Sequence, residues 1–106
     1  MQKLFTAAIR KATPKLGTTS DMKAEDVYVQ FKLFNPCGAG TWYVTEADFD
    51  TGEAFGFAEI TDGELGYFSL NEIAALRCPP FGLKVERDIH WDSKTTLKQV
   101  MDGARR

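Results

Sequence analysis

The sequence predicts an α+β domain in which short helices cover one face of an antiparallel sheet. Short segments of alternating apolar and polar residues recur between residues 27 and 68, separated by turn-forming residues. Apolar residues at helical spacing occur instead near both ends of the chain and once between them. We therefore expect an antiparallel meander of four strands, a fifth strand, and N-terminal, central and C-terminal helices in a single domain spanning residues 1–106.

The meander is predicted from segments in which every second residue is apolar. In the first segment one face carries only apolar side chains: Val27, Val29, Phe31 and Leu33. The four predicted strands are residues 27–34, 41–46, 54–60 and 65–68. Residues 15–25 are small and polar, which predicts a surface loop. Asp62–Gly63 lies between the last two strands, and an Asp-Gly pair in that position predicts a two-residue type I′ turn.

The stretch after the meander predicts a short helix with well-defined ends. Ser69 and Glu72 have the spacing of a capping box, in which each side chain satisfies a free backbone N–H. Phe68 and Ile73 have the spacing of a hydrophobic staple. The two prolines at positions 79–80 cannot continue a helix, so we expect it to end before them.

Beyond Gly82 the period of the sequence changes to two, which predicts the fifth strand over residues 83–91. One face of this strand would carry Leu83, Val85, Arg87, Ile89 and Trp91. Arg87 is the only charged member of that face. Because a buried charge is normally paired, we expect Arg87 to bind a carboxylate such as Glu46 or Glu64.

Helices are also predicted at the two ends of the chain. Residues 1–12 are amphipathic at helical spacing, and Thr6 is a suitable N-cap. Near the other end, Thr95 or Thr96 is expected to cap a last helix that Gly103 terminates.

Nothing in the sequence predicts a membrane span or a secretion signal. The chain has no run of about 18 apolar residues, and its first twelve residues are too charged for a signal peptide. We therefore expect a cytoplasmic protein in which Cys37 and Cys78 are reduced thiols, with a disulfide between their loops as the alternative.

The charges are unevenly distributed, although the net charge is only −2. Between Lys32 and Arg77 there are eight acidic residues and no basic one, whereas both ends of the chain are mildly basic. An acidic middle favours association with a basic partner through electrostatic steering.

The sequence contains no convincing catalytic or metal-binding pattern, so we expect no catalytic residue, no metal and no cofactor. His90 is the only histidine and is expected to be an exposed strand residue. Asp48, Asp50 and Glu59 have partial calcium-loop spacing, but the flanking segments are strands and the required glycine is missing. Two cysteines are too few for a structural zinc site.

Aromatic residues are concentrated in the acidic region, and on a sheet covered on one face we expect Trp42, Tyr43 and Tyr67 to remain partly exposed. An aromatic platform for single-stranded nucleic acid would also need a basic groove, which this region lacks. A protein-binding surface is therefore favoured. The residues predicted to contact a partner are Trp42, Tyr43, Glu46, Glu53, Glu64, Tyr67, Arg87 and Trp91.

Three ordered blocks of sequence resemble a bacterial family of small proteins, the domain of unknown function 2958. These blocks are Thr41–Glu46, Gly63–Leu70 and Phe81–Ile89. Members of that family are common on phages, plasmids and other mobile elements. The resemblance implies a protein of the bacterial host cytoplasm, often encoded near anti-restriction genes, and it implies no reaction and no catalytic residues.

Two functions are consistent with these observations. The favoured one is a non-enzymatic protein-binding module with an acidic, aromatic-rich surface that acts on a basic, nucleic-acid-handling or defence protein, as an anti-restriction or anti-CRISPR type inhibitor. The alternative is a small enzyme or ligand-binding domain, which requires Glu46, Glu64, Tyr67 and Arg87 to converge in one pocket. Direct nucleic-acid binding through the basic ends is less favoured, because terminal charges are usually solvated.

Overall fold

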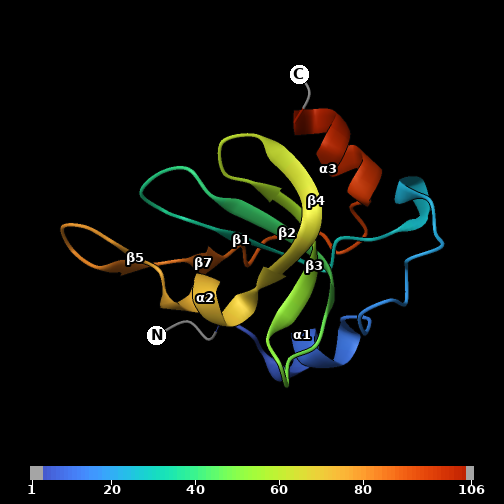
Figure 1. Ribbon diagram of the computed structural model, residues 1–106, viewed down its shortest axis with the longest axis horizontal. Helices are drawn as coiled ribbons and strands as arrows, with labels where there is room; N and C mark the ends of the chain where they lie inside the picture. Colours follow the sequence, from blue (N-terminus) through green and yellow to red (C-terminus); the bar gives the residue numbers. More distant parts are fainter. Residues whose placement is uncertain (1–3, 105–106) are drawn as a thin grey trace.

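The computed structural model describes residues 4–104, which form a five-stranded antiparallel sheet with short helices (Figure 1). The strands of this sheet are β1 (Phe31–Phe34), β2 (Thr41–Ala47), β3 (Glu53–Glu59), β4 (Gly63–Ser69) and β7 (Glu86–Arg87). Their order is β4-β3-β2-β1-β7, so the meander is confirmed and a fifth strand pairs with β1. The α+β class is therefore confirmed.

One face of the sheet packs against the N-terminal segment and two helices, α1 (Ala7–Ala12) and α2 (Leu70–Ala75). Trp42 and Val44 project from β2 towards this side, where they join a buried apolar cluster. The other buried members are Phe31, Leu33, Ala47, Ala54, Leu70, Ile73 and Val85. Phe5 and Ile9 pack against the cluster from the N-terminal side.

The opposite face packs against α3 (Leu97–Ala104) and a short 3-10 helix, η1 (Ala24–Asp26). Its buried cluster comprises Val27, Val29, Phe57 and Leu97. The helices therefore lie on both faces of the sheet rather than one, and Figure 1 shows α3 (red) well separated from α1 and α2. The predicted strand 27–34 is divided as well, because it enters the ladder only at Phe31 while its first half packs beneath α3.

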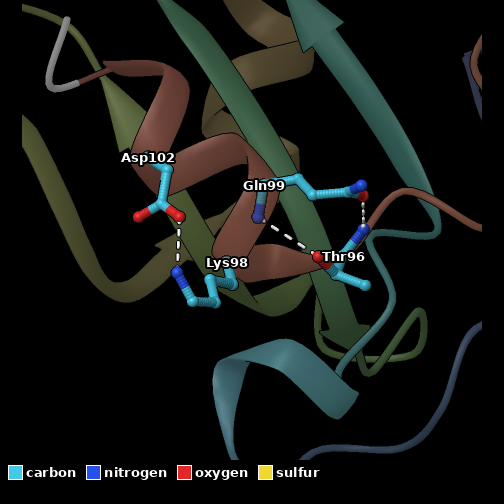
Figure 2. A network of polar contacts seen from close by, with 4 residues as sticks. All are labelled: Thr96, Lys98, Gln99 and Asp102. Atoms are coloured by element: carbon cyan, nitrogen blue, oxygen red, sulfur yellow. Dashed lines mark hydrogen bonds and ion pairs between the residues drawn. The ribbon is translucent and has the colours of Figure 1, made fainter.

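Local capping explains where the helices begin. The Oγ of Ser69 accepts a hydrogen bond from the N–H of Glu72 (3.1 Å), as the capping box predicts. Figure 2 shows that α3 has a reciprocal box: Thr96 Oγ1 accepts from Gln99 N (3.1 Å) and Gln99 Oε1 accepts from Thr96 N (2.8 Å). Thr96 rather than Thr95 is thus the cap.

The N-terminal helix was predicted over residues 1–12 and is observed from Ala7, capped by Thr6 Oγ1. Residues 1–3 of that prediction lie outside the described part of the chain. At the other end, Gly103 was predicted to terminate the last helix, which is wrong because Gly103 lies inside α3.

The β3–β4 turn differs from the predicted type I′ turn. Glu59 pairs with Gly63, so the connection has three residues, and neither Asp62 nor Gly63 has the positive φ that this turn requires. Gly63 is instead the first residue of β4. A Cβ at this position would lie 2.2 Å from the ring of Phe57, which explains the glycine by packing rather than by turn geometry.

The predicted strand 83–91 is also wrong in its extent. Leu83 and Lys84 form β6, which pairs with β5 (Arg77–Cys78) in a separate hairpin that projects at the left of Figure 1. Only Glu86–Arg87 joins the main sheet. The strand ends at Arg87, and the side chain of the next residue, Asp88, accepts a hydrogen bond from His90 N (2.9 Å) and so closes a turn.

The two cysteines are paired. A disulfide joins Cys37, in the β1–β2 connection, to Cys78 of β5, with a Cα–Cα distance of 6.4 Å. The prediction of two free thiols is therefore wrong for this structure, and the disulfide ties the β5–β6 hairpin to the main sheet. Among residues 4–104, no helix has the length and apolar character needed to cross a bilayer.

Candidate functional site

The structure does not bring the eight predicted contact residues together. Arg87 lies in β7 at one edge of the sheet, whereas Glu64 and Tyr67 lie in β4 at the opposite edge. Three strands separate them, which corresponds to about 19 Å at the usual strand spacing. The cluster of Glu46, Glu64, Tyr67 and Arg87 required for the enzyme hypothesis is therefore not formed.

Two of the predicted residues belong to the packed face under α1 and α2. Trp42 is buried, with 6% of its surface exposed, and it cannot contact a partner without unfolding. Arg87 is half-buried and donates a hydrogen bond to the backbone carbonyl of Leu4 (2.9 Å). Arg87 is paired in register with Leu33, while Glu46 is paired with Phe55 on the other face, so the predicted Arg87–Glu46 ion pair is wrong.

Tyr43 and Trp91 contact each other beside α3. Their ring centroids are 5.7 Å apart, and the Nε1 of Trp91 donates a hydrogen bond to the carbonyl of Val29 (2.8 Å). The ammonium of Lys32 lies 5.7 Å from the centroid of the Tyr43 ring. Burial raises the pKa of Tyr43, and the nearby carboxylate of Glu59 raises it further. Both rings are half-buried. They pack against the buried cluster beneath α3 and do not form an open surface.

Glu46 is buried, with 3% of its surface exposed, and it anchors the loop that precedes η1. Its Oε1 accepts a hydrogen bond from Gly17 N (2.8 Å), and its Oε2 accepts from the N–H and the hydroxyl of Thr19 (both 2.5 Å). Burial alone would raise the pKa of Glu46, but the hydrogen bonds from Thr19 and Gly17 outweigh it and lower the pKa below its usual value. The carboxylate is therefore ionised at neutral pH.

A β-bulge brings Glu46 to this position. The register of β2 and β3 shifts between Val44 and Glu46, so Thr45 is an additional residue on β2. Without the bulge, Glu46 would lie with Trp42 and Val44 on the face that packs against α1 and α2, as strict alternation predicts.

β4 is the longer of the two edge strands of the main sheet, and in the described region it pairs only with β3. Two of its large hydrophobic side chains are exposed, Leu65 (46%) and Tyr67 (64%), and the carboxylate side chain of Glu64 is exposed beside them. Tyr67 was among the predicted contact residues and Leu65 was not. The ring of Tyr67 makes an edge-on contact with Phe55, with 5.0 Å between centroids.

The backbone groups of Leu65 and Tyr67 point away from β3. In an antiparallel ladder, pairs that exchange hydrogen bonds alternate with pairs that do not. Leu70 N donates to Gly52 O (2.7 Å), so the hydrogen-bonded pairs that follow in this register are those of Phe68 and Gly66. The pairs of Tyr67 and Leu65 therefore exchange no hydrogen bonds with β3. Their N–H and C=O groups face the open edge.

Tyr67 lines two hollows. The first, which we name the Glu46 cavity, is about 300 Å³ and lies between the residue 17–24 loop and the sheet. The second, about 500 Å³, has two acidic residues in its lining, Asp48 and Glu53. The edge of β4 thus combines free backbone groups, exposed apolar side chains and neighbouring carboxylates.

Comparison with known proteins gave one result. A family model described as "Protein of unknown function (DUF2958)" matches residues 4–106. No curated protein and no solved structure matched the chain. Because the match covers nearly the whole chain, this protein belongs to the family of unknown function DUF2958.

Proposed function

We propose that this protein is a non-enzymatic binding module that adds an extended segment of a partner protein to the edge of β4. The observation that carries the proposal is the exposed edge itself, seven residues long from Gly63 to Ser69. Natural proteins usually protect such edges with lysine, proline or a bulge. β4 contains no lysine and no proline, and its ladder with β3 has no bulge.

Strand addition would use the groups that the fold leaves free. The outward N–H and C=O groups of Leu65 and Tyr67 would bond to the backbone of the added strand, which supplies affinity. Their exposed side chains would be covered at the same time, and burial of apolar surface contributes roughly 25 cal/mol per Å². Aromatic side chains such as Tyr67 are typical of the residues that dominate binding energy at protein interfaces.

The charges near β4 favour a basic partner. Glu53, Asp62 and Glu64 are all exposed on β4, on the neighbouring β3 or in the turn between them. No basic residue occurs between Lys32 and Arg77 to offset them. Such a field speeds association with a positively charged protein and rejects an acidic one.

The cellular role is a further part of the proposal. We propose that the partner is a basic, nucleic-acid-handling or defence protein of the bacterial cytoplasm, and that the chain acts from a mobile element as a counter-defence inhibitor. The fold supports the binding mode, and the acidic surroundings of β4 support the basic partner.

A selection of extended peptides from a random display library tests this proposal. We expect the purified chain to enrich peptides of strand-forming composition that carry lysine or arginine. A Glu53→Lys/Glu64→Lys variant should lose about tenfold in affinity for them at low salt, and the loss should shrink as salt is added. The matched control is Glu25→Lys/Glu86→Lys, which changes net charge equally at exposed positions outside β3 and β4.

The proposal also predicts a backbone effect. Proline at position 65 removes an N–H that points away from β3, so the sheet should persist while peptide binding is lost. Failure to enrich any peptide, or equal binding by Leu65→Pro and the wild type, would contradict strand addition.

A further inference from the structure

The Glu46 cavity lies beside the edge of β4. Its apolar walls and its carboxylate would not be used by backbone pairing alone. Its walls are mostly apolar, and its inner end holds a carboxylate. Met22, Phe55, Leu65, Tyr67 and Leu97 contribute to the walls. Met22, Leu65 and Tyr67 are exposed, so the cavity opens towards the β4 side, where an added strand would lie.

The charge at the inner end has no cationic partner within residues 4–104. Glu46 is held by the neutral groups of Gly17 and Thr19, and the ion pair observed in this part of the chain is Lys98–Asp102 on α3. An ionised carboxylate beside apolar walls attracts a cation more strongly than it would in water, because the local dielectric constant is lower.

The register of the sheet places this charge in line with the added strand. Glu46 is paired with Phe55, and Phe55 is paired with Tyr67, so the three side chains form one row across the sheet. A strand added beyond Tyr67 would lie about 14 Å from Glu46 at normal strand spacing. A lysine or arginine side chain spans about half of that distance with an apolar stem and a charged head.

We propose that the Glu46 cavity is the specificity pocket for a lysine or arginine side chain of the segment that adds to β4. This inference rests on the proposed function and specifies its partner. The stem of the side chain lies against Leu65, Tyr67 and Phe55, and its cationic head stands in the field of Glu46. In strand addition generally, backbone pairing supplies affinity and such pockets supply specificity.

A second copy of this chain is a poorer occupant. If two β4 strands paired with each other, the cavity of one copy would face residues 63–69 of the other, which contain no lysine or arginine. The buried carboxylate would then remain without a cation, so charge complementarity favours a basic segment of a different protein.

The test compares a selected peptide with the same peptide in which the lysine on the cavity side is replaced by norleucine, which has the same four-carbon stem and lacks the ammonium group. We expect the wild type to bind the lysine peptide about tenfold more tightly by calorimetry. Glu46→Gln should bind the two peptides equally, because binding of the norleucine peptide does not depend on a charge at position 46. The norleucine peptide thus reports whether the variant still folds and binds.

A second variant leaves the hydrogen bonds of Glu46 intact. Met22→Lys places a cation of the chain itself at the cavity wall, and it should remove the preference for lysine, whereas Met22→Gln should retain it. If both peptides bind the wild type equally, the specificity pocket is wrong and strand addition survives. If neither peptide binds, the proposed function itself fails. If the preference persists in Glu46→Gln and in Met22→Lys, the cation lies elsewhere and the inference is overturned.

Discussion

At the scale of single residues, Glu46 does most to connect the sheet with the loop above it. A buried charge is tolerated only where hydrogen bonds replace its lost hydration. Here three hydrogen bonds from Gly17 and Thr19 do so, which ties the residue 17–24 loop to β2 across the second face of the sheet. The carboxylate therefore has a structural role whether or not a partner also uses its charge.

The contribution of Glu46 to stability should depend on pH. Its pKa is lowered in the folded state, so the stabilisation is fully present above its ordinary value of 4.5 and is lost as the pH falls through the folded-state pKa. At pH 7 we expect Glu46→Gln to reduce the free energy of unfolding by about 2 kcal/mol. Urea titrations at a series of pH values measure this difference, which should shrink below pH 4.5.

The control for this experiment is Glu53→Gln, since Glu53 is exposed at the start of β3. It should change the free energy of unfolding by less than about 0.5 kcal/mol. A Glu46→Gln difference that stays constant from neutral to acidic pH would show that the loss arises from packing and not from the charge.

The sequence predicted that Tyr67 is partly exposed, which is confirmed, but the contacts that it predicted for Glu46 and Arg87 were wrong. Strict alternation assigned Glu46 to the face of Trp42, and a bulge that depends on pairing with β3 moved it to the other face. Leu65 was missed because exposure of an apolar strand residue depends on which strand lies at the edge, which is a property of the whole sheet. The available signal was the position of residues 63–69 at the end of the meander.

At the scale of elements, the helix caps and the pairing within the meander were predictable, and the partners of the segment after Arg77 were not. Each helix cap acts within one helical turn, so the sequence spacing predicts it. This holds for Ser69 and Glu72 at α2 and for Thr96 at α3. The segment 83–91 alternates regularly, yet it divides between two sheets because residues 77–84 pair among themselves. Pairing choices of this kind are not local.

Two glycines that face each other across β3 and β4 provide a test of the ladder. Gly56 and Gly66 are directly paired. A Cβ at Gly56 would lie 1.9 Å from the carbonyl oxygen of Tyr43, whereas a Cβ at Gly66 meets nothing within 4 Å. Gly56→Ala should therefore destabilise the protein by about 3 kcal/mol, because backbone must move to make room.

Gly66→Ala is the matched substitution, and it should leave stability unchanged or raise it by about 0.5 kcal/mol. Thermal or urea unfolding of the two variants measures both effects. Equal destabilisation by the two substitutions would contradict the close approach of β3 to the backbone of β2 at Gly56 and the open space beside Gly66.

At the scale of the whole molecule, the sheet has faces that helices cover and an edge at β4 that stays open. One face of the sheet is closed by α1, α2 and the N-terminal segment, and part of the other is closed by α3 and η1. The region of β4 near Leu65 and Tyr67 remains open, and Tyr67 lines two hollows there. Composition predicted an acidic, aromatic region, but only the sheet order shows that its accessible part is an edge.

The most direct test of strand addition is amide hydrogen exchange of β4, measured by NMR with and without a bound peptide. The amides of Leu65 and Tyr67 point outwards and should exchange rapidly in the free protein, then at least about tenfold more slowly in the complex. The amides of Gly66 and Phe68 already bond to β3 and are the internal control, since binding should protect them much less. Protection confined to other elements, with Leu65 and Tyr67 unchanged in the complex, would contradict the account.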